Sequence, residues 1–85
     1  MNMYHVYVIL SRRNGKRYVG YTQKTPEQRL KEHNQGVNTW TRQNGPFDLI
    51  HRENFSSRHA AIKQEIYLKS AAGRKYLKKI LGAVA

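Results

Sequence analysis

Two tyrosines and a glycine near the start of the chain are the first residues whose types and spacing suit chemistry. Tyr7 lies in a run of β-branched and aromatic residues, and after ten intervening residues Tyr18 and then Gly20 lie in a second such run. If the two runs pair as a hairpin, the tyrosines face each other, and the glycine lets another group approach the backbone closely. The alternative is ordinary strand structure, because tyrosine is a good strand former and Gly20 can mark a β-bulge.

Arg29 and His33 form the second candidate pair. They are four residues apart, so in a helix they lie on one face. Together they can bind a phosphate, because a guanidinium group binds phosphate bidentately and an imidazole exchanges a proton near neutral pH. A solvent-exposed basic helix face with no ligand is the alternative, and both interpretations stay open from these residues.

Glu65 is the third candidate. Helical geometry places it on the same arc as Ala61 and Leu68, which is expected to face the core. A carboxylate there is costly unless it is paired, hydrogen-bonded or bound to a cation. Arg29 or Lys69 can provide the pairing. The other interpretation is a Mg²⁺ site in which water and phosphate oxygens complete the coordination shell.

A β-hairpin is expected to position the tyrosines. Residues 4–10 and 16–21 have strand composition, and Asn14-Gly15 between them predicts a tight turn, because both residues tolerate positive φ. Period-two alternation then places Tyr18 and Gly20 on one face of the second strand.

A helix is expected to carry Arg29 and His33. Thr25 supplies an N-cap hydroxyl and is followed by Pro, Glu and Gln, all typical of a first turn, and Gly36 ends the helix. Only Leu30 is strongly apolar between these limits, so packing alone does not explain the composition.

The rest of the chain completes a small α+β fold. The predicted order is β-β-α-β-α-α, a three-stranded, mainly antiparallel sheet flanked by helices, in a single domain spanning residues 1–85. The remaining elements are a turn-rich connection over 37–46, a strand over 47–55, a helix from Ser56 or Ser57 to Lys69, and a last helix from Ser70 or Ala71 with Tyr76, Leu77, Ile80 and Leu81 in one apolar stripe.

Composition narrows the class of partner. The formal net charge is +11 at pH 7 on 85 residues, which favours a polyanion, most commonly nucleic acid, although a membrane surface or a heparin-like polymer also fits. The chain has no cysteine, which excludes disulfides, a thiolate nucleophile and cysteine-based metal sites. No segment has the length of a membrane span or the pattern of a signal peptide, and a cytoplasmic location is expected. The residues predicted to contact nucleic acid are Lys16, Arg17, Trp40, Arg42 and Lys69.

The hairpin, the basic helix and the embedded glutamate, in this order, resemble the GIY-YIG nuclease superfamily over nearly the whole chain. The short stand-alone forms, similar to the nuclease domain of the bacterial excision-repair endonuclease, match best. The residues that carry the resemblance are His5-Val6-Tyr7 for the first motif, Tyr18-Val19-Gly20 for the second, residues 29–34 for the arginine-containing helix, and Glu65 for the metal-binding glutamate.

The resemblance implies a metal-dependent DNA endonuclease that hydrolyses phosphodiester bonds with one Mg²⁺ or Mn²⁺. It implies that Glu65 holds the metal and that Arg29 neutralises charge on the phosphate. Tyr18 would activate water or act as general base, Tyr7 would position it by hydrogen bonding, and His33 would assist or contact phosphate. Branched, single-stranded or nicked DNA is the implied substrate, in repair or recombination, with a protein partner as a source of specificity.

The chain departs from the family pattern in two places. His5 stands where the first motif usually has glycine, and the tail 73–85 lacks the Asn often found near the end of larger family members. These departures leave a second hypothesis open, in which the same fold is a nucleic-acid-binding module with little or no cleavage activity.

Overall fold

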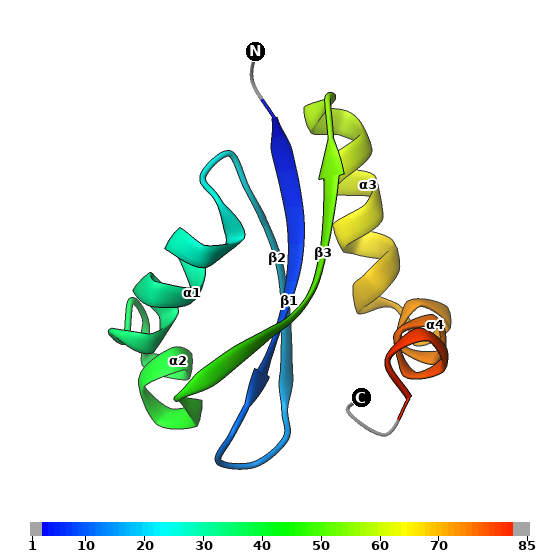
Figure 1. Ribbon diagram of the computed structural model, residues 1–85. Helices are drawn as coiled ribbons and strands as arrows, with labels where there is room; N and C mark the ends of the chain where they lie inside the picture. Colours follow the sequence, from blue (N-terminus) through cyan, green and yellow to red (C-terminus); the bar gives the residue numbers. More distant parts are fainter. Residues whose placement is uncertain (1–2, 83–85) are drawn as a thin grey trace.

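A three-stranded antiparallel sheet lies between two layers of helices (Figure 1). A computed structural model describes residues 3–82. The elements are β1 (Tyr4–Ser11), β2 (Arg17–Thr22), α1 (Pro26–Asn34), α2 (Thr39–Asn44), β3 (Phe47–Phe55), α3 (Arg58–Lys69) and α4 (Ala71–Leu81). The strand order is β2-β1-β3, with α1 and α2 on one side of the sheet and α3 and α4 on the other. The α+β class and the predicted order of the major elements are confirmed.

The connection over residues 37–46 contains a short helix, α2, where only turns were predicted. Its start depends on Asn38, whose side chain accepts a hydrogen bond from the Thr41 backbone N at 2.9 Å, while the Thr41 hydroxyl accepts one from the Asn38 backbone N at 3.1 Å. This reciprocal capping satisfies backbone donors of a helix too short to be stable alone. An Asn-x-x-Thr pattern is a weak sequence signal for the start of a helix. The turn-forming residues of this segment therefore led to the prediction of a connection without a helix.

Strand β1 is buried on both faces because it is the central strand. Val6 and Val8 pack in the core under α3 and α4, whereas Tyr7 and Ile9 pack on the α1 and α2 side. A strand covered on both faces has a continuous apolar run rather than an alternating pattern. Tyr7 therefore lies on the sheet face that α1 covers.

The hairpin turn is wider than predicted. Residues 12–16 connect the two strands, and Gly15 has φ +73°. A tight turn centred on Asn14-Gly15 needs positive φ at both residues, but no non-glycine residue within 3–82 has positive φ. The prediction of a tight Asn14-Gly15 turn is therefore wrong. Instead the Asn14 side chain accepts a hydrogen bond from the Lys16 backbone N at 3.0 Å and donates one to the Asn44 side chain at 2.7 Å. The tie to the end of α2 stabilises the longer loop.

The last helix presents less of its apolar stripe to the core than predicted. Leu77 is 1% exposed, but Tyr76 and Ile80 are 39% and 43% exposed. Because α4 packs mainly on α3 and not on the sheet, only a narrow edge of α4 is covered. Within residues 3–82, no helix has the length and apolar character needed to cross a membrane.

Candidate active site

Tyr7, Tyr18 and Gly20 lie on one face of the hairpin. Tyr7 pairs with Gly20 in the β1–β2 ladder, so Tyr18 is its diagonal neighbour rather than its direct partner, with ring centroids 6.3 Å apart. The ladder is continuous at Gly20, which removes the β-bulge explanation. A Cβ added at Gly20 would lie 2.6 Å from the Tyr7 hydroxyl oxygen. The close approach inferred for this glycine is made by the Tyr7 side chain itself.

Gly20→Ala is expected to displace Tyr7 and to lower the free energy of unfolding by about 1–3 kcal/mol, the usual cost of overpacking. Cleavage is expected to fall more than stability explains, because the Tyr7 hydroxyl moves. Chemical denaturation and an activity assay below the transition measure the two effects. Gly15→Ala is the control, since its positive φ also makes alanine unfavourable but a Cβ there meets nothing within 4 Å. Unchanged stability and activity of Gly20→Ala would contradict the packing argument.

His33 is enclosed behind the tyrosines. Its side chain is 0% exposed, its Nε2 lies 2.9 Å from the Tyr7 hydroxyl oxygen, and its ring centroid is 4.8 Å from that of Tyr18. Burial, followed by the positive charge of Arg29, lowers the pKa of His33, so the imidazole is neutral at pH 7. An enclosed imidazole does not reach a phosphate directly. The geometry instead makes His33 a residue that positions Tyr7.

Arg29 lies between Tyr7 and Glu32. Its guanidinium forms an ion pair with Glu32, and a quarter of its side chain is exposed, at 25%. Hydrogen bonding from Lys24, together with Arg29, lowers the pKa of Glu32 to about 2. Glu32 is therefore ionised at neutral pH and anchors Arg29, whose side chain stays partly exposed.

Tyr7 is a neutral phenol at pH 7. Burial is the largest cause that raises its pKa, and the nearby charges of Tyr18 and Glu65 raise it further, while Arg29 lowers it. The raised pKa makes Tyr7 a poor base at pH 7, and its hydroxyl oxygen lies within hydrogen-bond distance of His33 Nε2.

Glu65 contributes a partly buried carboxylate to the same cluster. Its side chain is 16% exposed, and its Oε2 lies 3.7 Å from Lys69 Nζ. Of the two predicted partners, Lys69 is the one found, because Arg29 pairs with Glu32. Within residues 3–82, no group of three or more His, Asp or Glu side chains can hold a metal. A single carboxylate oxygen donor still suits Mg²⁺, which keeps several waters and binds substrate phosphate.

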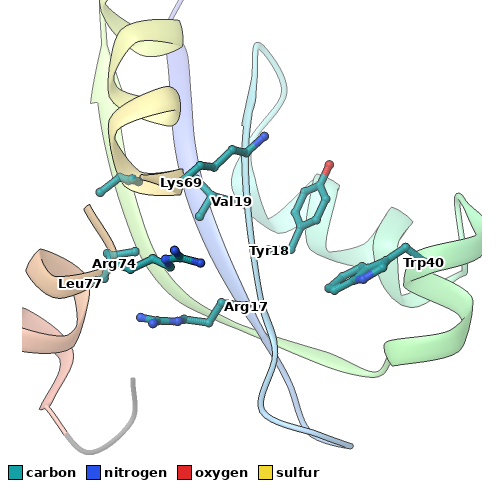
Figure 2. Close-up of a pocket in the computed structure, with 8 residues that line it drawn as sticks. Arg17, Tyr18, Val19, Trp40, Lys69, Arg74 and Leu77 are labelled. Atoms are coloured by element: carbon teal, nitrogen blue, oxygen red, sulfur yellow. The ribbon is translucent and has the colours of Figure 1, made fainter. Parts of the chain in front are cut away.

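A groove of about 390 Å³ lies beside this cluster (Figure 2). Its polar walls come from Arg17 and Tyr18 on β2, Trp40 on α2, Lys69 at the end of α3 and Arg74 on α4. The structure therefore brings together three residues predicted to contact nucleic acid, and it adds Arg74. Tyr18 belongs to both the cluster and the groove.

Trp40 has two contacts that explain its place in the groove. Its ring stacks on Phe47 at a centroid distance of 5.5 Å and lies 5.6 Å from the Tyr18 ring. The contact with Phe47 holds α2 against the sheet. The side chain also lines the groove, where its predicted contact with nucleic acid would take place.

Lys16 and Arg42 lie outside the groove. Lys16 is exposed in the hairpin turn. Arg42 donates hydrogen bonds to the Gly36 carbonyl and the Thr39 hydroxyl, both at 3.1 Å, so its guanidinium ties α2 to the end of α1. Nucleic-acid contact by either residue remains a prediction, and neither is placed beside Tyr18.

Sequence analysis missed Arg74 because it stands among other basic residues of α4. The one local signal is Gly73 before it. A Cβ at Gly73 would lie 1.9 Å from the Tyr67 carbonyl oxygen, so α4 begins directly against the end of α3. A glycine inside a segment that otherwise consists of good helix-forming residues is a sign of such close packing.

The fold, with a cluster of two tyrosines, an arginine and a glutamate that shares Tyr18 with the groove, defines a class of small nuclease domain, and comparison with known proteins agrees. The GIY-YIG catalytic domain family matches residues 3–78. The chain belongs to the GIY-YIG nuclease family, which confirms the resemblance seen in its motifs.

Relatives within this family carry the name UPF0213. A UPF0213 protein of Haloquadratum walsbyi is 39% identical over 71 residues, which is 82% of this chain and 79% of the relative. One from Staphylococcus saprophyticus is 31% identical over 81 residues, covering 94% of this chain and 96% of the relative. The solution NMR structure of a UPF0213 protein from Bacillus halodurans is similar, with 30% identity and a TM-score of 0.57, covering 95% of this chain and 87% of that one.

Proposed function

We propose that this protein is a divalent-metal-dependent endonuclease that hydrolyses phosphodiester bonds of DNA. The observation that carries the proposal is the partly buried carboxylate of Glu65, which pairs with Lys69 on the wall of the groove that Tyr18 also lines. The same cluster contains Tyr18 and Arg29, and it opens onto a groove lined by cationic side chains. A net charge of +11 attracts DNA to this surface.

Glu65 is the residue that would hold Mg²⁺ or Mn²⁺. The ion would stabilise negative charge that develops on the phosphate oxygens during hydrolysis. Arg29 would stabilise the same charge with its partly exposed side chain, and Glu32 keeps it in place. Electrostatic stabilisation by these groups supplies most of the rate enhancement in this mechanism.

Tyr18 is the residue proposed to accept a proton from the attacking water. A free tyrosine has a pKa near 10 and is a poor base at pH 7, so a phenolate needs cations around it. Arg17 and Lys69 line the same groove and provide positive charge. The Tyr7–His33 pair, which packs against the Tyr18 ring, holds that ring in position.

One contact favours the alternative of a binding module. The Lys69 ammonium lies 3.7 Å from the Glu65 carboxylate and already neutralises part of its charge. If this ion pair persists in the presence of a divalent ion, the carboxylate is not free to hold the ion. The groove would then bind DNA without cleaving it.

Cleavage assays on supercoiled, single-stranded, flapped and branched DNA test the proposal. The expected result is nicking in Mg²⁺ or Mn²⁺ that EDTA abolishes, and supercoiled plasmid reports a single nick. Preference for flaps or branches over intact duplex would support a role in repair or recombination. Binding without cleavage on all four substrates with both metals would reject the nuclease and favour the binding module.

A further inference from the structure

Two arginines that are far apart in the sequence and lie on different elements line the groove. Arg17 comes from β2 and Arg74 from α4, and Figure 2 shows their guanidinium groups extending toward each other from opposite sides of the groove. The Arg17 Nη1 is buried and has no hydrogen-bond partner within residues 3–82. A buried donor without a partner is costly, and two cations in one groove add repulsion.

Among residues 3–82, no Asp or Glu side chain pairs with either of these arginines. The sequence contains five Asp and Glu residues, and each lies within ion-pair or hydrogen-bond distance of another Lys, Arg or His side chain. The pairs are Glu27–Arg52, Glu32–Lys24 and Glu32–Arg29, Asp48–Arg12, Glu53–His51, and Glu65–Lys69. The side chains described within residues 3–82 therefore leave Arg17 and Arg74 without a paired carboxylate, which suits an anionic ligand.

Backbone packing holds Arg74 in this position. Besides the Tyr67 carbonyl, a Cβ at Gly73 would meet the Leu68 Cα at 2.5 Å. The Ser70 hydroxyl accepts a hydrogen bond from the Gly73 backbone N at 3.1 Å, which caps the first turn of α4. Arg74 thus projects from a rigid junction of two helices, and the arginine pair is part of the fold.

We propose that Arg17 and Arg74 together bind one phosphate of the DNA strand, next to the phosphate that is cleaved. The inference rests on the proposed function for the position of the cleaved phosphate. Tyr18 lines the same groove as both arginines, so a strand with one phosphate at Tyr18 passes between them. Two planar guanidinium groups can donate several hydrogen bonds to one phosphate, including the donor that Arg17 leaves unpaired.

DNA affinity of arginine variants tests this phosphate site. Arg17→Gln, Arg74→Gln and the double variant are compared with Lys78→Gln, which removes the same charge from an exposed position of α4 outside the groove. Fluorescence anisotropy of a fluorescein-labelled single-stranded 12-mer in EDTA measures binding without turnover. Each arginine variant is expected to bind about tenfold more weakly, and Lys78→Gln less than twofold.

The double variant shows whether the two arginines share a phosphate. We expect it to lose less than the product of the two single losses, because residues that hold one group are coupled. The slope of log Kd against log salt should fall by about 1 in the double variant. If the affinity losses of the two single variants multiply in the double variant, the arginines bind two separate phosphates. If the affinity losses are as small as that of Lys78→Gln, the arginines form no phosphate site. Either result overturns the proposal.

Thermal unfolding separates binding from a structural role. Without DNA, Arg74→Gln should unfold at or above the wild-type temperature, since it relieves repulsion. A lower unfolding temperature with unchanged DNA affinity would assign Arg74 to the fold and overturn the proposal. Because the binding assay needs no metal and no cleavage, it reports on the arginine pair even if the wild-type protein fails to nick DNA. Conversely, normal nicking with unchanged affinity would reject only the phosphate site.

Discussion

Glu65→Gln is expected to reduce metal-dependent cleavage by about a thousandfold or more while most of the DNA affinity remains. Glutamine keeps the size of the side chain and removes the charge that would hold a divalent ion, and metal stabilisation of phosphate charge contributes several kcal/mol. DNA affinity should persist because the cationic groove is unchanged and Lys69 loses its carboxylate partner. Plasmid nicking, oligonucleotide binding and Mn²⁺ titration by calorimetry measure the three properties.

Stability decides whether Glu65 acts as a metal ligand or as a structural ion pair. Lys69 is 52% exposed, so the loss of this pair should cost little, as for other pairs near the surface. Glu27→Gln is the matched control, because it removes the same charge from an exposed carboxylate paired with Arg52. A loss of about 3 kcal/mol or more in Glu65→Gln, together with retained cleavage, would make the structural role correct and the metal assignment wrong.

Tyr18→Phe is expected to lower kcat by about a hundredfold or more with little change in stability. The substitution removes only the hydroxyl, and proton transfer by a positioned side chain contributes about 10²–10⁴ in rate. The ring should keep its place, because its contacts with His33 and Trp40 do not involve the hydroxyl, which points away from Trp40 in Figure 2. Turnover, DNA affinity and thermal unfolding are measured together.

Tyr7→Phe provides the comparison for the Tyr18 result. It breaks the Tyr7–His33 hydrogen bond and leaves a fully buried imidazole without that partner, which costs about 1–3 kcal/mol. The two conservative variants should therefore differ: Tyr18→Phe loses rate, and Tyr7→Phe loses stability as well. Wild-type turnover in Tyr18→Phe would remove Tyr18 as the base, and the exposed Tyr67→Phe should match the wild type in both measurements.

Features with local causes were predictable from the sequence. The strand over residues 47–55 was predicted with the bounds that the structure shows. Thr25, Ser57 and Ser70 each accept the backbone hydrogen bond expected of an N-cap. Helix caps and strand alternation depend on neighbours within a few residues, so they can be read before the chain folds.

The contacts of the site depended on the packing of helices against the sheet. Two partners were possible for Glu65, and only the distance between α3 and α1 decides that Lys69 is the one. The position of α1 also encloses His33 behind Tyr7, although its spacing from Arg29 was equally typical of an exposed helix face.

What the sequence by itself determined about this protein is the three strands and the three longer helices, the family and the side chains available for phosphate chemistry. The tertiary structure alone decided which of those side chains meet. Gly20 is one example. The sequence placed it in a strand, but only the structure shows that the Tyr7 ring occupies the space where a Cβ of residue 20 would lie. Arg74 is a second example, because only the contact of Gly73 with the end of α3 brings it to the groove of Arg17. The physical reason is that local propensity acts over a few residues, whereas burial and charge pairing join residues tens of positions apart.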